Sequence, residues 1–337
     1  MKAVVVGAGV AGLVCATELL DRGFAVQVFE QGSQVGTRAC SWYAGGMLAP
    51  WCERESAEQA VIDLGRESIH WWERHTGCVN RRGSLVVAPA RDRSELQRFG
   101  RRTSMFEWVD GGRIAELEPD LAGRFNTGLY FSQEAHIDPR QAMQGLADHL
   151  IAAGASLVFD TAVDPDELAA DITCAADVVL DCRGFAARAA WPGMRGVKGE
   201  MLIVRCPDFA LSRPVRLLHP RIPLYVVPRA DHHFMIGATM IESEDRHRIS
   251  VRSMLELLGS AYALNPVLGE AEILETGVDV RPAWPDNLPR VIRRGKVLGV
   301  NGFYRHGFLL SPAMARLAAD EAIGLAGSDR TLASHAL

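Results

Sequence analysis

The chain has 337 residues, 48% of them hydrophobic and 23% charged, which is the composition of a globular protein with a large core and about two domains. A formal net charge of -5 gives no reason to expect nucleic acid or an anionic membrane surface as a partner. No stretch approaches about 18 consecutive apolar residues, so we expect no transmembrane helix. The seven cysteines form no CxxC pair, and the first strand leaves no room for a cleaved signal peptide, so we expect reduced thiols in a cytoplasmic protein.

The first thirty residues predict a strand, a glycine-rich turn, a helix and a second strand that ends at an acid. The regular segments are the strand Lys2–Val6, the helix Val10–Asp21 and the strand Ala25–Phe29. In the turn, Gly7 permits a sharp change of direction, Gly9 lets a pyrophosphate approach the backbone, and Gly12 lets the helix pack closely on the sheet. The helix N-terminus offers free N–H groups to that pyrophosphate. Glu30 lies 23 positions after Gly7, where its carboxylate can accept hydrogen bonds from a ribose, so the segment predicts a Rossmann-like dinucleotide-binding fold.

Helical and strand patterns alternate along the rest of the chain. Asp138-Pro139 places an N-cap aspartate before a proline at the first helical position, which predicts the start of a helix that ends near Ala153. The other helices are predicted over Ser56–His75, from Asp92 or Ser94 to about Phe99, over Val251–Leu264 and over Ser311–Ala326. The other strands are predicted over Gly83–Pro89, Leu129–Phe131, Ala155–Phe159, Asp177–Asp181, Met201–Val204, Leu224–Val227, His233–Ile236 and Val297–Val300.

The elements typical of nucleotide binding lie at the start, the middle and the end of the chain, and the antiparallel strands lie between them. This order predicts α/β and α+β structure, in which a Rossmann-like domain is interleaved with an antiparallel-sheet substrate domain. The dinucleotide-binding domain is predicted over 1–85, 135–197 and 275–337, and the substrate domain over 86–134 and 198–274. No simple linker is expected between them.

Seven motifs outside the opening fingerprint carry a family resemblance. They are Arg38-Ala-Cys-Ser-Trp-Tyr-Ala-Gly-Gly-Met-Leu-Ala-Pro50, Val178-Val-Leu-Asp-Cys-Arg-Gly184, Val197-Lys-Gly-Glu200, Leu224-Tyr-Val-Val-Pro-Arg229, Ile236-Gly-Ala-Thr239, Gly277-Val-Asp-Val-Arg-Pro282 and Asn301-Gly-Phe-Tyr-Arg-His-Gly-Phe-Leu-Leu-Ser-Pro312. Together with the fingerprint they resemble, over nearly the whole chain, the D-amino-acid oxidase superfamily of flavoproteins, most closely its glycine oxidases of thiamine biosynthesis. The resemblance implies that the dinucleotide is FAD, whereas the fingerprint by itself leaves an NAD-dependent dehydrogenase open.

The resemblance assigns residues to the FAD site by their place in these motifs. The segment 303–309 would run along the isoalloxazine, and the N-terminus of the final helix would lie near the pyrimidine oxygen, where its dipole suits the negative charge of the reduced flavin. Noncovalent attachment is implied, because Tyr43 follows Trp42 where related dehydrogenases carry a flavin-linking histidine, and no cysteine follows Cys206. The implied FAD contacts are Gly7, Gly9, Val10, Ala11, Gly12, Glu30, Gln31, Arg38, Gly45, Gly46, Met47, Val163, Gly184, Phe303, Tyr304, Arg305, His306, Gly307, Phe308 and Leu309.

The same motifs supply candidate catalytic residues. Arg281 is the candidate carboxylate clamp, because a guanidinium binds a carboxylate through two charge-assisted hydrogen bonds. The resemblance gives Arg305 as a second substrate-contacting arginine, and Tyr225 could donate to the same carboxylate. Met47 follows the glycine pair of the segment 38–50, which by the resemblance would pass beside the flavin and is called the flavin loop below. Each also has a non-functional interpretation: Arg281 and Arg305 as surface arginines, Tyr225 as a strand tyrosine with its hydroxyl at the surface, and Met47 as a core residue. No general base is needed if a neutral amine binds directly, and no metal ligands are nominated.

The implied function is FAD-dependent oxidative deamination of glycine and other small amines to an imine and glyoxylate, with O2 reduced to H2O2, for thiamine thiazole biosynthesis. The alternative in the same fold is a D-amino-acid or sarcosine-type dehydrogenase with an acceptor other than oxygen. A flavin-holding module without catalysis is a further alternative, against which the joint presence of Tyr225, Arg281 and Arg305 counts. The expected partners are a small amino acid, O2 and, from the resemblance, further copies of the chain in a homo-oligomer.

Overall fold

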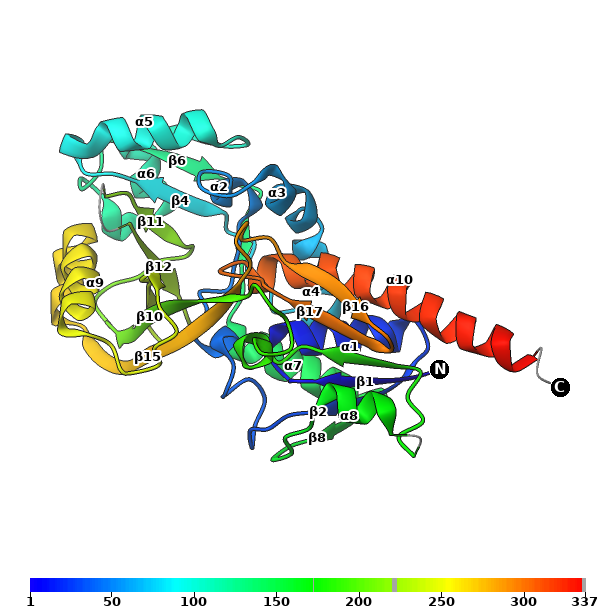
Figure 1. Ribbon diagram of the computed structural model, residues 1–337. Helices are drawn as coiled ribbons and strands as arrows, with labels where there is room; N and C mark the ends of the chain where they lie inside the picture. The colour runs from blue at the N-terminus through cyan, green and yellow to red at the C-terminus, as the bar shows by residue number, and fades with distance from the viewer. Residues whose placement is uncertain (172, 220–222, 335–337) are drawn as a thin grey trace.

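Two β-sheets with their own helices make up the computed structural model, which describes residues 1–171, 173–219 and 223–334 (Figure 1). The six-stranded sheet has the order β16 (Arg290–Arg294), β17 (Val297–Asn301), β9 (Val178–Asp181), β1 (Lys2–Val6), β2 (Ala25–Phe29) and β8 (Ser156–Val158). The nine-stranded sheet has the order β14 (Ile241–Glu242), β10 (Arg195–Arg205), β13 (His233–Gly237), β12 (Leu224–Pro228), β11 (Val215–Leu217), β4 (Ser84–Val87), β6 (Thr127–Phe131) and β5 (Glu107–Asp110), with β15 (Glu272–Ala283) on the other side of β10.

The helices lie outside these two sheets. A pair of short strands joins the flavin loop to the segment that precedes the helix Pro139–Ala152. The short strands are β3 (Met47–Leu48) and β7 (Ala135–His136). The helices are α1 (Val10–Asp21), α2 (Pro50–Glu53), α3 (Gln59–Gly65), α4 (Ser68–Thr76), α5 (Arg93–Arg102), α6 (Gly111–Leu117), α7 (Pro139–Ala152), α8 (Pro165–Ala170), α9 (Val251–Leu264) and α10 (Gly307–Ser334). The predicted fold class is therefore confirmed, with parallel and antiparallel sheets in one chain.

The central strands β1, β9 and β17 of the six-stranded sheet are buried on both faces, which explains why they read as continuous apolar runs. The strands of this sheet pair parallel, except that β16 is antiparallel to β17. Along β1, Ala3 and Val5 belong to the core formed with α1, α7 and α10. Val4 and Val6 belong to the core on the other face, together with Trp284 and residues of α8. This layering is the Rossmann-like arrangement that the first thirty residues predict.

The nine-stranded sheet uses its two faces differently. Leu202, Phe234 and Ile236 pack with buried residues of α9 and α6 into the core of this half. Met201 and Val227 point to the other face, which turns toward the six-stranded half of the molecule. The predicted antiparallel character holds for the pairs formed by β5, β6, β10, β12, β13 and β15, but β4 and β11 pair parallel.

The domain boundaries drawn from the sequence fall inside three strands of the nine-stranded sheet. The boundary after residue 85 divides β4, the one after 197 divides β10, and the one after 274 divides β15. Ladder hydrogen bonds join all residues of a strand to one sheet, so these three strands belong whole to the nine-stranded half. The interleaving itself is visible in Figure 1, where the six-stranded sheet takes strands from the start, the middle and the end of the chain.

Two helix predictions differ from the structure. The predicted helix over Ser56–His75 is divided into α3 and α4, both of which pack on α10; a Cβ at Gly65 would lie 2.9 Å from the side chain of Leu309. The sequence predicts that the final helix starts at Ser311, but the helix begins at Gly307, so Pro312 lies inside it.

A tryptophan compensates for the proline inside α10. Pro312 has no N–H to donate to the carbonyl of Phe308, four residues earlier. That carbonyl accepts instead from Nε1 of Trp72 on α4 at 2.8 Å and from Oγ of Ser68 at 3.4 Å. Proline usually stands at the start of a helix, but here the contact with Trp72 lets the helix begin five residues before Pro312, at Gly307. The helix N-terminus therefore lies in the segment that lines the cleft.

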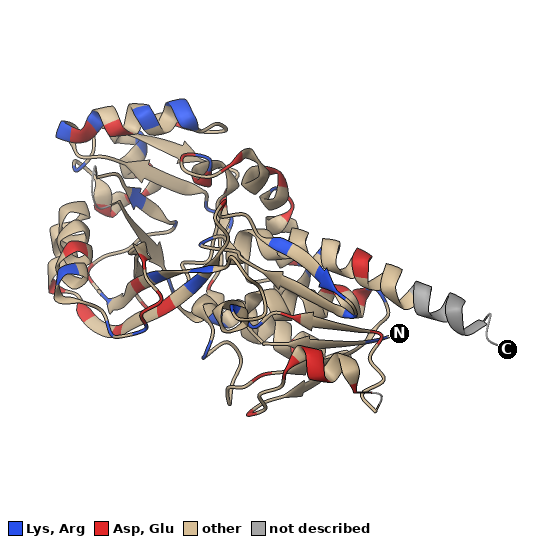
Figure 2. Ribbon diagram, in the orientation of Figure 1, with Lys and Arg blue, Asp and Glu red and all other residues tan. Residues whose placement is uncertain are grey.

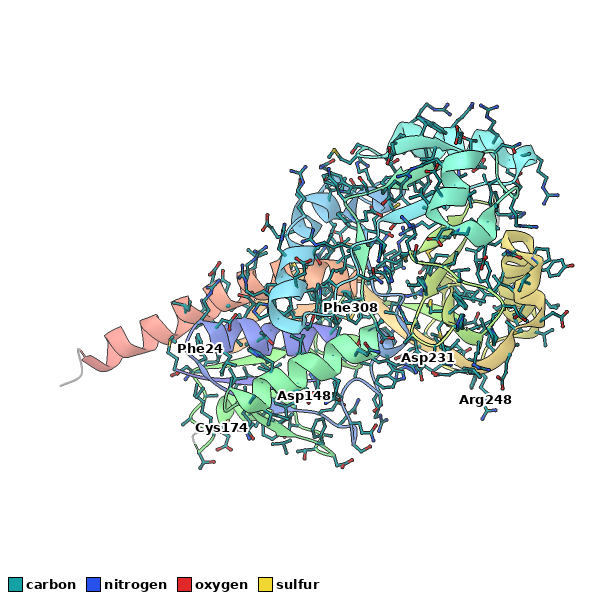
Figure 3. The ribbon with its side chains drawn as sticks, turned by 180° about the vertical axis from the view of Figure 1, so that it is seen from behind. Phe24, Asp148, Cys174, Asp231, Arg248 and Phe308 are labelled. Carbon is teal, nitrogen blue, oxygen red and sulfur yellow. The ribbon has the colours of Figure 1, made fainter. Side chains whose placement is uncertain are left out.

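Charged residues of both signs are spread over the molecule, with the arginines of α5 at its outer edge (Figure 2). Seen from behind, Phe308 lies where the two halves meet, with Phe24 and Asp148 in the six-stranded half and Asp231 and Arg248 in the nine-stranded half (Figure 3). Within the described ranges, no helix has both the length and the hydropathy needed to cross a bilayer.

Candidate active site

A long cleft runs between the two halves and takes its walls from both. The six-stranded half contributes the turn after β1, the ends of β2 and β9, the chain after β8 and the loop that leads into β3. The nine-stranded half contributes residues of β10, β12 and β15, and the segment 303–309 also lines the cleft. Every candidate site residue named from the sequence lines this cleft except Gly12. The fold thus brings together positions that lie as far apart as Gly7 and Leu309.

The glycine turn after β1 is as tight as its sequence predicts. Gly7 has a φ of +102°, and a Cβ there would lie 2.7 Å from the carbonyl oxygen of Cys182. At Gly12 a Cβ would overlap the carbonyl oxygen of Gly7, so this glycine lies behind the turn and allows the close packing of α1. At Gly9 a Cβ would lie 3.1 Å from the side chain of Ala39 and would narrow the cleft.

The acid at the end of β2 is held in place by the backbone. Ala8 N donates to Glu30 Oε2 at 2.7 Å, and Gly32 N donates to Oε1 at 2.8 Å. Each carboxylate oxygen has a further lone pair, so the group can still accept hydrogen bonds from a ribose. Nearby, Val10 N donates to Ser41 Oγ at 3.3 Å, which ties the first turn of α1 to the flavin loop.

These features fit the dinucleotide that the sequence predicts. Gly9, the N-cap of α1, has no side chain to cap the helix, and it lines the cleft. Gly307, the first residue of α10, also lines the cleft, so two helix N-termini face it. Helix N-termini attract anionic groups, and the glycine turn lets a pyrophosphate approach the backbone. In the part of the chain that the structure describes, no group of three or more His, Cys, Asp or Glu side chains is placed to hold a metal ion.

One row of residues crosses five strands of the nine-stranded sheet on the face toward the cleft. The β-register places opposite one another, in order from β11 to β15, Arg216, Tyr225, Gly237, Met201 and Gly277. Residues paired directly across strands point to the same face. The two glycines make room for aromatic rings: a Cβ at Gly237 would lie 3.0 Å from the Tyr225 hydroxyl oxygen, and one at Gly277 would overlap the ring of Tyr43. The row therefore presents Tyr225 to the cleft.

Arg281 lies on the same face of β15, four residues after Gly277, and lines the cleft. Its NH1 donates to the carbonyl oxygen of Thr239 at 3.0 Å. The guanidinium covers Gly199, where a Cβ would overlap its Cζ. Among the described residues the structure gives this guanidinium no further hydrogen bond or ion pair, so its remaining donors are available to an anionic ligand.

Tyr225 can act only as a neutral hydrogen-bond donor or acceptor at neutral pH. Burial raises the pKa of its hydroxyl, and the positive charges of Arg281, Arg216 and Arg305 oppose that rise only in part. A protonated hydroxyl beside Arg281 can donate to the same carboxylate. The structure places Tyr225, half-buried, in the wall of the cleft.

Met47 lies between an apolar cluster and the cleft. It packs against the apolar cluster of Met201, Val227 and Met235, and it also lines the cleft next to Gly45. A Cβ at Gly45 would lie 3.1 Å from the Tyr225 ring and 3.5 Å from Met47 Cε. The space beside Tyr225 is therefore narrow.

Arg305 lines the cleft but is already paired with an acid that the sequence did not single out. Its NH2 lies 2.7 Å from Oε2 of Glu53, which is 7% exposed and also bonds His306 Nε2 at 2.9 Å. Arg216 donates to the other carboxylate oxygen of Glu53. These arginines and His306 hold the pKa of Glu53 well below its usual range against the effect of burial. Sequence patterns could not reveal the cluster, because Glu53 lies 163 positions from Arg216 and 253 from His306.

Arg229 is a second residue whose role only the structure reveals. It follows Tyr225 in the strand motif, but its guanidinium is buried and donates to the carbonyl oxygens of Gly45 at 2.8 Å and Ala44 at 3.3 Å. Its Nε lies 3.4 Å from Asp138. Arg229 thus fastens the flavin loop of one half of the molecule to a strand of the other.

Comparison with known proteins identifies the family of the chain. The model of the family described as "FAD dependent oxidoreductase" matches residues 2–321. A Rhizobium etli protein with the provisional name thiamine biosynthesis oxidoreductase ThiO is 56% identical over 316 residues, covering 94% of each chain.

Two further relatives come from Geobacillus kaustophilus. A glycine oxidase of that organism is 30% identical, covering 94% of this chain and 91% of its own. A crystal structure of glycine oxidase from Geobacillus kaustophilus superposes with a TM-score of 0.79 at 26% identity, covering 95% of this chain and 94% of that one. The chain belongs to the FAD-dependent oxidoreductase family and is an enzyme of the glycine oxidase and ThiO type.

Proposed function

We propose that the enzyme oxidises glycine and other small amines, in the overall reaction of glycine, O2 and water to glyoxylate, ammonia and H2O2. The observation that carries the proposal is the placement of Arg281 and Tyr225 on one wall of the cleft, facing the segment 303–309. A guanidinium with donors to spare and a protonated hydroxyl together suit one carboxylate. An α-amino acid is the simplest substrate that such a pair would hold by one end.

The protein's part in this reaction is orientation and exclusion of water. FAD, when bound, supplies the chemistry by taking two electrons and the hydrogen from the substrate Cα. Arg281 and Tyr225 would fix the carboxylate, so that the Cα–H has one direction to face. The side chains of Met47 and Met201 would exclude water from the reacting end. No residue is required to remove a proton if the amine binds in its neutral form.

A small substrate is supported by the crowding beside Tyr225. The Tyr225 ring and Met47 Cε lie so near Gly45 that even a Cβ at this glycine would approach them to 3.1 and 3.5 Å. Glycine has no side chain to place in such a space, and sarcosine adds only a methyl group on nitrogen. We propose a role in thiamine biosynthesis on the strength of the ThiO name of the Rhizobium etli relative, in which the imine would be the useful product.

Noncovalent binding of FAD is part of the proposal. Two cysteines, Cys40 and Cys182, line the cleft. Burial raises the pKa of Cys40 to about 12, and a hydrogen bond with Cys15, together with burial, raises the pKa of Cys182 well above its ordinary value, so both remain thiols, which are poor nucleophiles. Tyr43, at the position where related dehydrogenases carry a histidine, packs over Gly277 instead of offering a ring nitrogen. Denaturation with trichloroacetic acid should release all the flavin into the supernatant.

The test of the function is the visible spectrum of the holoenzyme before and after anaerobic addition of glycine. Bleaching by glycine and rapid recovery in air, with one H2O2 formed per glyoxylate, is the expected result. Bleaching with slow recovery in air, but fast recovery with a quinone or dye, would support the dehydrogenase alternative. A spectrum that responds to neither glycine, sarcosine nor small D-amino acids would refute the proposal.

A further inference from the structure

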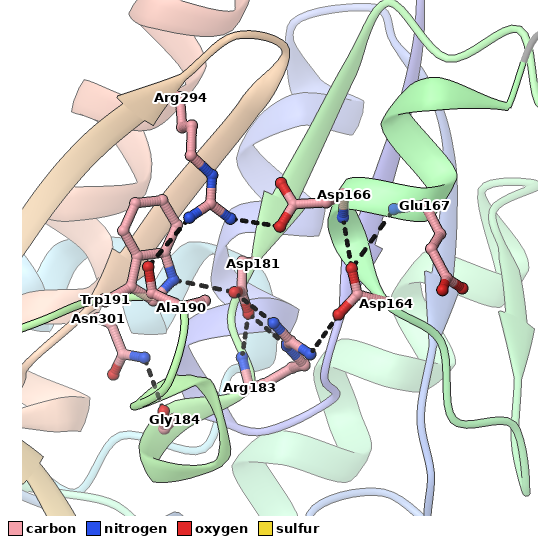
Figure 4. Close-up of polar contacts among 10 residues, drawn as sticks. All are labelled: Asp164, Asp166, Glu167, Asp181, Arg183, Gly184, Ala190, Trp191, Arg294 and Asn301. Carbon is pink, nitrogen blue, oxygen red and sulfur yellow. Dashed lines mark hydrogen bonds and ion pairs between the residues drawn. The ribbon is translucent and has the colours of Figure 1, made fainter.

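An ion-pair network beside the cleft contains a fixed guanidinium (Figure 4). Asp181 is the last residue of β9 and is fully buried. Arg183 Nε and NH2 donate to its two carboxylate oxygens, each at 2.9 Å, and Arg183 NH1 lies 3.5 Å from Asp164 Oδ2. Trp191 Nε1 donates to Asp181 Oδ2 at 2.9 Å. These contacts fix the plane of the Arg183 guanidinium.

The network lies at one end of the cleft. Arg183 lines the cleft together with Phe29, Glu30 and Val163. Asp164, its second ion-pair partner, directly follows Val163 in the chain. Arg183 therefore links the end of β9 to the segment after β8, two strands that β1 and β2 separate in the sheet. Since Glu30 is the acid placed for a ribose, this is the end of the cleft where the adenosine of a dinucleotide belongs.

The hydrogen-bonding edge of the Arg183 guanidinium is occupied, so the interaction still open to it is stacking through its flat face. Its Nε, NH1 and NH2 are directed at two carboxylates, which also balance its charge, so the group is poorly suited to bind a phosphate. Its side chain nevertheless remains 21% exposed. A guanidinium whose edge is occupied can still stack its face on an aromatic ring, and nucleobases are frequent partners for such stacking.

We propose that Arg183 is a further cofactor-positioning residue, whose guanidinium face packs on the adenine ring of FAD while Asp181 and Asp164 hold it in plane. This proposal rests on FAD as the cofactor and is independent of the substrate. Arg183 would contact the adenine, whereas the glycine turn would contact the pyrophosphate and Glu30 the ribose. The proposal also predicts that Arg183 contributes to the binding of FAD and not to that of FMN, which has no adenosine.

The test measures the preference of the holoenzyme for FAD over FMN. Holoenzyme at a fixed FAD concentration is equilibrated with increasing FMN, the bound flavins are separated from free flavin and extracted, and their ratio gives the relative Kd. Arg183→Lys keeps the positive charge but removes the planar guanidinium group, and Arg183→Ala removes both. The matched control is Arg294→Ala, because Arg294 pairs with Asp166 in the same network but does not line the cleft.

The expected result is a loss of about tenfold or more in the preference for FAD over FMN in both Arg183 variants, with Arg294→Ala near the unchanged protein. An unchanged preference in Arg183→Ala would overturn the proposal. Retention of the preference in Arg183→Lys alone would show a charge contact and would also overturn it, as would an equal weakening of FAD and FMN. If Arg183→Ala does not fold, Asp181→Asn, which frees the guanidinium, is expected to reduce the preference in the same direction, and no reduction would refute the stacking role.

Discussion

Replacement of Arg281 by alanine is the perturbation that tests the proposed substrate site most directly. Arg281 uses NH1 for the carbonyl oxygen of Thr239, and no other partner is recorded within the described residues. Its remaining donors can form two charge-assisted hydrogen bonds to a substrate carboxylate. The replacement also removes the group that covers Gly199, but it leaves the glycine turn and Glu30 at the other end of the cleft untouched.

The expected loss follows from those two bonds. A hydrogen bond to a charged group contributes roughly 1.5 kcal/mol net, so two contribute about 3 kcal/mol, or roughly 150-fold in kcat/KM. Because a carboxylate is bound alike before and during the reaction, most of this loss should appear in KM and little in kcat. FAD content should not change, since no predicted FAD contact is altered.

The assay is anaerobic reduction of the bound flavin by glycine in a stopped-flow instrument, together with the spectral shift caused by acetate as a non-reacting carboxylate. The matched control is Arg246→Ala, because Arg246 lines the same wall but is paired with Asp279 at 3.4 Å. The control should change kcat/KM by no more than roughly threefold, as for an exposed ion pair. Glycine kinetics and acetate binding that stay unchanged in Arg281→Ala would refute the clamp.

Three further predictions concern neighbouring residues. Tyr225→Phe removes one donor to the substrate carboxylate and should raise KM for glycine by roughly tenfold, about 1.4 kcal/mol, in steady-state kinetics with unchanged flavin content; an unchanged KM would show that the hydroxyl does not reach the substrate. Burial raises the pKa of Glu134 from 4.5 to about 7, so the native form keeps a proton that the unfolded chain has lost, and the free energy of unfolding should fall by up to about 3 kcal/mol as pH rises from 4.5 through 7. Denaturant unfolding at saturating FAD should show this fall, Glu134→Gln should lack it, and identical pH profiles would contradict the assignment. Gly277→Ala forces a methyl group against the ring of Tyr43 and should lower both Tm and FAD affinity, whereas Gly259→Ala, with nothing within 4 Å, should not lower Tm; equal Tm values would argue against the close approach.

The FAD-binding half could be predicted from sequence because its signals are local. The turn from Gly7 to Gly12 and the acid at Glu30 lie within thirty residues, and each follows from the backbone geometry of one strand–turn–helix unit. The N-cap of α7 is equally local, since Asp138 accepts from the N–H groups of Arg140 and Gln141, as its sequence predicts. Each of these features is decided by residues that are neighbours in the chain.

The errors of prediction share the opposite property. The start of α10 depends on Trp72, which bonds the carbonyl that Pro312 leaves without a partner. The boundaries inside β4, β10 and β15 could not be seen, because a strand's sheet is set by partners far away in the sequence. Local propensity describes what a segment tolerates, and tertiary packing selects among the tolerated states.

The dinucleotide fingerprint and the order of the main elements can be predicted from the amino acids alone, and motifs that resemble a known superfamily supply the candidate positions Tyr225, Arg281 and Arg305. The surroundings of those positions depend on tertiary packing. It pairs Arg305 with Glu53 while leaving Arg281 with donors to spare, and it fixes Arg183 beside the cleft. The charge environment of a side chain is set by groups within a few ångströms in space, and in the Glu53 cluster those groups come from segments separated by more than a hundred positions.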